Sequence, residues 1–208
     1  MDRKSALIVI DMQQGFLSPA SAQCITGAAA TVPACTALIN NCRERNIPVF
    51  FVVRKYRADG SDVEHTRYNS WLKGGKALSP GCDSSVGDAM PEAFGFCQKD
   101  YLIVKPRFSA FFQTELDIML RRLGINTVLL AGTTTPNCIR STCYDAISLE
   151  YNAVVFSDCT SSVTEEIQQA NLLDMGNVGA QIISSEDFIS GKVKITDSTG
   201  DVQRRVRP

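Results

Sequence analysis

The stretch Leu129-Leu130-Ala131-Gly132-Thr133-Thr134-Thr135-Pro136-Asn137-Cys138-Ile139-Arg140 decides how this chain is interpreted. It begins as an apolar strand, continues through a tight turn of small and polar residues, and reaches Cys138 where a helix is expected to begin. The first turn of a helix has free backbone N–H groups and a partial positive charge. Both favour the thiolate form of cysteine, which is the form that attacks a carbonyl carbon. Cys138 is therefore a candidate nucleophile.

Short apolar runs rich in β-branched residues recur along the chain and are separated by helical patterns. Such runs, without polar alternation, are typical of strands buried on both faces in a parallel sheet. The predicted strands are residues 6–10, 49–53, 101–104, 127–131, 153–156 and 180–183. Alternating strands and helices predict an α/β fold of three layers, Rossmann-like, around a six-stranded and mostly parallel sheet. We expect one domain over residues 1–190 and a polar, loosely attached tail over residues 191–208.

Composition excludes several classes of partner. The 208 residues carry a net charge of −1, so nothing directs the chain to nucleic acid or to an anionic membrane. No apolar run approaches the roughly 20 residues that span a bilayer. The first residues lead directly into a strand and lack the pattern of a secretory signal, which predicts a cytoplasmic location. The eight cysteines are then expected to be reduced and mostly buried, because no two of them form a CxxC pair.

Polar side chains follow several of the predicted strands. Asp11, Arg54, Lys105 and the Cys138 turn should meet at one edge, because the carboxyl ends of parallel strands lie together. There Lys105 would lower the pKa of the thiol, and Asp11 would take its proton and return it to a leaving amine. Each residue also has a plainer interpretation: Asp11 as a loop cap, Lys105 as a solvated strand end, and Cys138 as one more buried cysteine.

The motifs around these residues resemble the isochorismatase-like cysteine hydrolase superfamily, which includes nicotinamidases, N-carbamoylsarcosine amidase, ureidoacrylate amidohydrolase and biuret hydrolase. The resemblance covers about residues 6–185. The matching segments are residues 6–13 with Phe16, residues 104–112, Ala131 and Gly132, residues 135–138, Asp145 with Ala146, and Asp158.

The resemblance implies a catalytic triad of Asp11, Lys105 and Cys138. It also implies a cis peptide between Thr133 and Thr134, which would direct the N–H of Thr134, together with that of Cys138, at an oxyanion. It implies a thioester intermediate, release of ammonia or an amine, and assembly into a homodimer or homotetramer.

The chain departs from the nicotinamidase pattern, which pairs an Asp-x-His motif with a second histidine at a metal site. Here His65 is the single histidine, so we expect no metal and no cofactor, and we do not expect nicotinamide as the substrate. Asp62, Glu64 and His65 fit a solvated loop better than a metal site.

Arginines are expected to take over substrate recognition, because a guanidinium suits a carboxylate or a planar ureido group. The predicted substrate-binding residues are Phe16, Arg54, Tyr56, Trp71 and Arg107. Two alternatives stay open at this stage: Arg107 could simply order its loop, and Trp71 could pack within the long loop.

Together these residues predict a cysteine-dependent hydrolase of a small linear amide or ureido (carbamoyl) compound. Two other functions remain. The fold could serve as a catalytically inactive scaffold, or Cys138 and Cys143 could act as a thiol oxidoreductase, although a spacing of five places them on different faces of a helix. The turn after the first strand lacks GxGxxG, which argues against dinucleotide binding.

Overall fold

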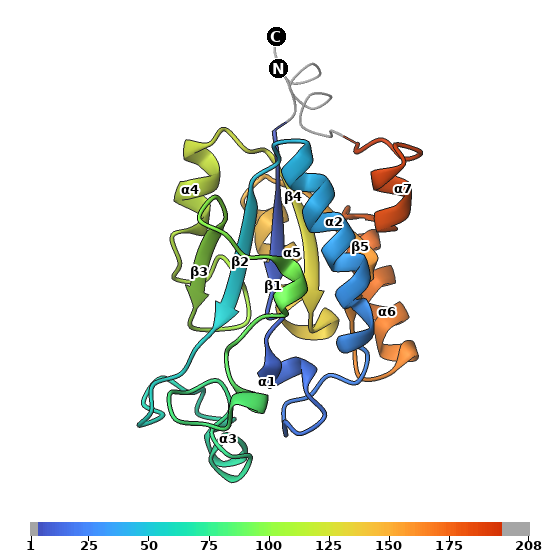
Figure 1. The fold of residues 1–208 in the computed structure, drawn as a ribbon. Coiled ribbons are helices and arrows are strands. Elements are labelled where there is room, and N and C mark those ends of the chain that lie inside the picture. The colour runs from blue at the N-terminus through green and yellow to red at the C-terminus, as the bar shows by residue number, and fades with distance from the viewer. Residues whose placement is uncertain (1–3, 197–208) are drawn as a thin grey trace.

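The computed structural model describes residues 4–196. Its centre is a six-stranded sheet with the order β3-β2-β1-β4-β5-β6, and every neighbouring pair of strands is parallel (Figure 1). The strands are β1 (Ser5–Ile10), β2 (Val49–Arg54), β3 (Tyr101–Lys105), β4 (Thr127–Thr133), β5 (Asn152–Ser161) and β6 (Gln181–Ile183). The predicted α/β architecture is confirmed, and β4 and β5 run further than the sequence indicated.

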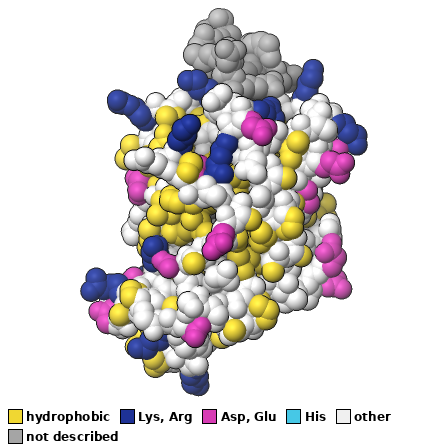
Figure 2. Space-filling view, viewed as in Figure 1, with side chains coloured by type: hydrophobic (Ala, Val, Ile, Leu, Met, Phe, Trp, Pro, Cys, Tyr) yellow, Lys and Arg dark blue, Asp and Glu magenta, His cyan; other side chains and the backbone are white. Residues whose placement is uncertain are grey.

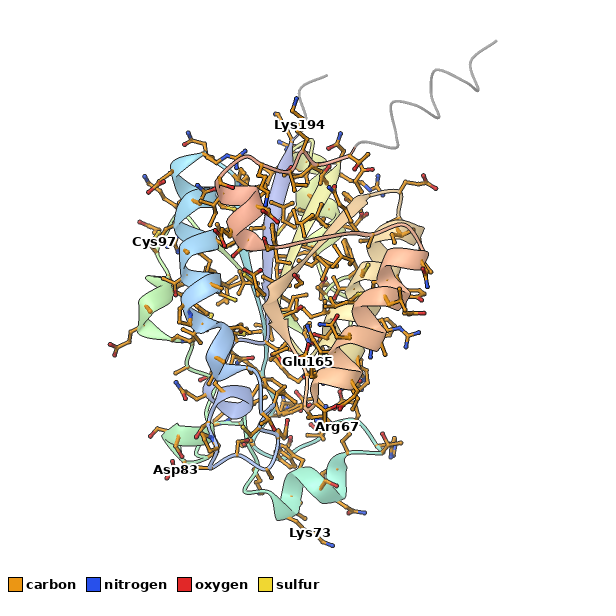
Figure 3. All side chains as sticks on the ribbon, turned by 90° about the vertical axis from the view of Figure 1, so that its right-hand side faces the viewer. Arg67, Lys73, Asp83, Cys97, Glu165 and Lys194 are labelled. Atoms are coloured by element: carbon orange, nitrogen blue, oxygen red, sulfur yellow. The ribbon has the colours of Figure 1, made fainter. Side chains whose placement is uncertain are left out.

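Helices cover both faces of the sheet and complete the three layers. One face carries α2 (Val32–Glu44) and α7 (Ser185–Ile189), and the other carries α4 (Leu116–Arg122), α5 (Arg140–Ser148) and α6 (Glu165–Asn177). Figure 3 shows the two helical layers on either side of the sheet. The short helices α1 (Gln14–Leu17) and α3 (Tyr68–Lys73) lie at the end of the molecule where the strands terminate (Figure 1).

Burial on both faces explains why the strands are apolar throughout. In β1, Ile8 and Ile10 belong to the core under α4 and α5, while Leu7 and Val9 belong to the core under α2. Successive side chains of a strand point to opposite faces, so both sets must be apolar. The edge strand β3 is less covered, and Leu102 and Val104 are exposed there. Figure 2 shows hydrophobic side chains in several patches on this side of the molecule.

The long segment between β2 and β3 folds over the carboxyl edge of the sheet. It is held by a third apolar cluster made of Phe16, Tyr56, Val63, Trp71, Ala77, Leu78 and Val86. The indole Nε1 of Trp71 donates a hydrogen bond to the carbonyl of Ala77 at 2.9 Å, which fixes the turn after α3. The segment is therefore an ordered cap on the strand ends.

The beginning of the expected tail contacts the domain. Val193 and Ile195 pack against the α2-side core, and Gln181 in β6 bonds the backbone of Lys194 and Thr196. Residues 197–208, the rest of that predicted tail, lie outside the described part of the chain. Within residues 4–196, no helix is long and apolar enough to cross a membrane.

Gly132 allows β4 to approach β1 where the site begins. Its φ is +116°, and a Cβ built there would lie 2.0 Å from the carbonyl oxygen of Ile10. Only glycine tolerates both this conformation and this contact. The residue therefore determines how closely the Cys138 turn approaches the end of β1.

We predict that Gly132→Ala lowers the free energy of unfolding by about 3 kcal/mol or more, because backbone must move to relieve the contact. Gly179 is the matched control, since its φ is +107° but a Cβ there would have no neighbour within 4 Å. Urea unfolding of Gly132→Ala and Gly179→Ala distinguishes two costs. Both variants have the unfavourable positive φ, but only Gly132→Ala also has the steric contact with Ile10. Equal losses of stability in the two variants would contradict the prediction.

Candidate active site

Three elements bring Asp11, Lys105 and Cys138 together. Asp11 follows β1, Lys105 ends β3, and Cys138 lies in a single π-helical turn (Thr135–Ile139) between β4 and α5. The Nζ of Lys105 is 2.8 Å from Oδ2 of Asp11 and 3.5 Å from Sγ of Cys138. All three side chains are buried, with at most 6% of any residue exposed. The three residues expected at one edge of the sheet are thus in direct contact.

Asp11 has an unusual backbone conformation for a residue at the end of a strand. Its φ is +53°, and its N–H donates to the carbonyl of Val52 at 2.8 Å. Aspartate is among the few non-glycine residues that adopt this left-handed region readily. At this turn the side chains of the chain stop alternating between the two faces of the sheet as they do along β1, and the carboxylate of Asp11 lies beside Lys105.

The ammonium of Lys105 has three close partners. Its Nζ donates hydrogen bonds to Cys138 and, at 3.1 Å, to the carbonyl of Arg107, and it forms an ion pair with Asp11, neither of whose carboxylate oxygens has a hydrogen-bond partner among the described residues. The group is therefore fixed between the carboxylate and the sulfur.

Burial changes the expected state of the thiol. The pKa of Cys138 is raised to about 11 by removal from water and by the charge of Asp11, against the opposing effect of Lys105 and Arg54. The expectation of a lowered pKa is therefore wrong for the resting site. Burial therefore favours the protonated thiol, and the role of Asp11 as the base that receives its proton stays a prediction.

The turn before Cys138 is held by β5. The peptide between Thr133 and Thr134 is cis. Thr133 Oγ1 accepts a hydrogen bond from Ser161 Oγ at 3.0 Å, and Thr135 Oγ1 donates to the carbonyl of Ser161 at 3.0 Å. The threonines are buried and ordered, and the oxyanion role of the Thr134 and Cys138 N–H groups stays a prediction.

Arg54 is fully buried beside this group. It pairs in register with Lys105 across β2 and β3, so both side chains lie on the same face of the sheet as Cys138. Its Nη1 donates to Tyr56 Oη at 3.0 Å and forms an ion pair with Glu64 Oε1. Tyr56 Oη in turn donates to Glu64 Oε2 at 2.9 Å. These contacts close a ring of three polar side chains.

The protonation states of Glu64 and Tyr56 depend on their burial and on their contacts with Arg54. Burial acts against the ionised form of Glu64, but Arg54 lowers the pKa of this carboxyl below its usual value. Burial raises the pKa of Tyr56 to about 12. At neutral pH the ring therefore consists of a guanidinium, a carboxylate and a neutral phenol.

Known proteins resemble this chain in sequence and in fold. The Isochorismatase domain model matches residues 5–187. The chain belongs to the isochorismatase family. It is 38% identical to a probable inactive nicotinamidase of Arabidopsis thaliana, over 86% of this chain and 91% of that protein. It is 26% identical to a maleamate amidohydrolase of Pseudomonas putida, over 89% of this chain and 85% of that enzyme. A crystal structure of an isochorismatase family protein from Desulfovibrio vulgaris superposes with a TM-score of 0.85 at 36% identity, covering 93% of this chain and all of that one.

Of the other predicted substrate-binding residues in this isochorismatase-family chain, only Tyr56 contacts the side chain of Arg54 among those the structure describes. Tyr56 joins Arg54, but Phe16 and Trp71 belong to the apolar cluster that holds the cap. Arg107 donates to the carbonyls of Asp62 at 3.0 Å and Pro106 at 2.6 Å, which orders the loop. Direct contact of Phe16, Trp71 and Arg107 with a substrate stays a prediction.

Three residues of the site were given no role in the sequence-based prediction. Gln13 bonds both the N–H and the carbonyl of Arg54, at 2.8 and 3.0 Å. Thr142 donates to the carbonyl of Cys138 at 2.7 Å and accepts from the N–H of Ala110. Glu64 was expected in a solvated loop, with metal binding as the less favoured alternative, whereas it is buried and pairs with Arg54. Among residues 4–196, no three His, Cys, Asp or Glu side chains gather in a metal-binding cluster.

We predict that Asp11→Asn makes the Cys138 thiol more acidic, because the charge that raises its pKa is removed while Lys105 and Arg54 remain. Alkylation of Cys138 by iodoacetamide should then reach half its maximal rate at a lower pH than in the wild type. Peptide mapping by mass spectrometry distinguishes Cys138 from the other cysteines. An unchanged or higher alkylation midpoint would contradict the role given to Asp11.

Proposed function

We propose that the chain is a cysteine amidohydrolase that cleaves the C–N bond of a small linear amide or ureido (carbamoyl) compound through a thioester. The observation that carries this proposal is the position of the Lys105 ammonium, 2.8 Å from the carboxylate of Asp11 and 3.5 Å from the sulfur of Cys138. A nucleophile, a base and a fixed cation in contact are the elements of nucleophilic acyl transfer.

In the proposed reaction, Sγ of Cys138 attacks the carbonyl carbon while its proton passes to Asp11. Negative charge develops on the carbonyl oxygen and is accepted by the N–H groups of Thr134 and Cys138. Asp11 then gives the proton to the leaving nitrogen, which departs as ammonia or an amine. A water molecule, deprotonated by Asp11, attacks the thioester and releases the acid, and the thiol recovers its proton.

A raised thiol pKa is compatible with this sequence of steps. Because Cys138 and Asp11 are adjacent, attack and proton transfer can occur together, and no stable thiolate has to form first. The ion pair with Lys105 holds the carboxylate of Asp11 in place. It also provides a positive charge next to the sulfur as negative charge builds there.

The named relatives support an amide substrate but do not agree on activity. The P. putida relative is a maleamate amidohydrolase, while the A. thaliana relative is described as a probable inactive nicotinamidase. With a single histidine, this chain cannot form a two-histidine metal site, which argues against nicotinamide. We therefore favour a linear amide or ureido compound.

Assembly into a homodimer or homotetramer remains part of the proposal. The exposed apolar side chains Phe96, Leu102 and Val104 lie on or beside the edge strand β3 and offer a face for a second copy.

We predict that Cys138→Ala abolishes ammonia release in a screen of biuret, ureidoacrylate, maleamate and N-carbamoyl amino acids. Cys143→Ala, the matched control, removes a buried thiol from α5 and should retain activity. This pair of variants also tests a thiol oxidoreductase, which would need both cysteines. Ammonia release that survives in Cys138→Ala would contradict the proposed mechanism, and no release by the wild type from any of these compounds would favour the inactive scaffold.

A further inference from the structure

We propose that Thr142 is a positioning residue, because its hydroxyl joins the turn that carries Cys138 to the loop that holds Lys105 and so sets the contact between their side chains. The inference rests on the proposed function and adds a residue to it. Thr142 lies in α5, four residues after Cys138. Its hydrogen bonds go to backbone groups and not to the reacting atoms.

The first argument is that the Thr142 hydroxyl is used on both sides. It donates to the carbonyl of Cys138 at 2.7 Å and accepts from the N–H of Ala110 at 2.9 Å, and the residue is fully buried. A carbonyl only accepts and a backbone N–H only donates, so these two partners fix the direction of the hydroxyl hydrogen. The hydroxyl is therefore a link of defined geometry between two backbone groups.

The second argument concerns the two segments that this link joins. Cys138 follows β4 and Ala110 follows β3, and β2 and β1 lie between these strands in the sheet (Figure 1). Neighbouring strands lie about 4.8 Å apart, so β3 and β4 are separated by about 14 Å and do not pair with each other. A connection between the segments that follow them must come from groups outside the ladder of sheet hydrogen bonds. Thr142 supplies such a connection.

The third argument is that the Ala110 end of the link also reaches Lys105. The loop after β3 contains both Ala110 and Arg107, and the carbonyl of Arg107 accepts from Lys105 Nζ at 3.1 Å. Cys138 is therefore connected to Lys105 in two ways. One is the direct contact, with 3.5 Å between Sγ and Nζ, and the other runs through the Thr142 hydroxyl and this loop.

Removing the hydroxyl should displace the nucleophile. Thr142→Val keeps the shape of the side chain, but the N–H of Ala110 loses its acceptor and the carbonyl of Cys138 loses this donor. A buried donor without a partner is unfavourable, so the two segments relax to find other partners and Sγ moves relative to Nζ. A misplacement of about 1 Å can cost an enzyme about 100-fold in rate. The loss should fall on kcat, because the contact matters to the chemical step and not to substrate binding.

The kinetic test compares Thr142→Val with Thr142→Ser, which keeps the hydroxyl and loses only the methyl group. Ammonia release is measured on the compounds that the wild type hydrolyses. We expect Thr142→Val to lower kcat about 10- to 100-fold with KM within about threefold of the wild type, and Thr142→Ser to keep kcat within about threefold. Thr36→Val is the matched control and should retain kcat, since Thr36 in α2 makes the same bond to the carbonyl four residues earlier, at 2.8 Å.

A merely structural role for Thr142 predicts a different result. Thr142→Val would then lower stability but not kcat, which would overturn the inference, as would equal losses of kcat in the Val and Ser variants or a loss confined to KM. If Thr142→Val does not fold, Thr142→Ala replaces it, because the space left by the side chain admits a water that pairs both backbone groups. A link through water is longer than the direct one, so kcat of Thr142→Ala should fall further than that of Thr142→Ser.

A second measurement does not depend on activity. Crystal structures of the wild type and of Thr142→Val give the distance between Sγ of Cys138 and Nζ of Lys105, which we expect to lengthen from 3.5 Å by about 0.5 Å or more. An unchanged distance would reject the role given to Thr142 and leave the proposed hydrolase standing. A longer distance in a protein whose wild type hydrolyses none of the screened compounds would reject the hydrolase and keep Thr142 as the residue that sets this contact.

Discussion

The buried ion pair between Lys105 and Asp11 is the interaction on which the rest of the site depends. Burying two charges is costly, and the cost is offset only when the geometry is good and the remaining donors are satisfied. Here Lys105 also donates to Cys138 and to a backbone carbonyl, whereas neither oxygen of Asp11 has a hydrogen-bond partner among the described residues. Removing either partner would leave an uncompensated charge, which typically costs 3–5 kcal/mol. The strand register that brings β1 and β3 to the same level is therefore needed for both the fold and the chemistry.

The sequence predicted this arrangement because it follows from backbone rules alone. Apolar runs without alternation indicate buried parallel strands, and such strands place their last residues at one edge. Asp11, Lys105 and Cys138 each come directly after such a run or the turn that follows it, so their meeting required no knowledge of side-chain packing. The confirmed fold and the contact among these three residues show how far that rule extends.

What the sequence did not predict depends on side-chain burial and on loop packing. Glu64 lies in a polar segment without periodicity, and nothing in its neighbours indicates that the segment folds back on Arg54. Gln13 has no distinguishing pattern, because its role is to bond backbone across a sheet edge. The thiol pKa had the wrong sign because the helix terminus and Lys105 were considered without the burial of Cys138, which dominates.

The two buried cations at this edge are held by different parts of the chain. Lys105 contacts Asp11, Cys138 and the carbonyl of Arg107. Arg54 has used only one of its nitrogens, and the partners of that nitrogen come from the cap over residues 55–99 and not from the sheet. Changes in the cap can therefore alter the surroundings of the Arg54 guanidinium while the contacts among Asp11, Lys105 and Cys138 stay the same. Connecting segments generally tolerate more sequence change than the strands they join, so this division lets the surroundings of the site change without disturbing the strand ends that hold the three residues together.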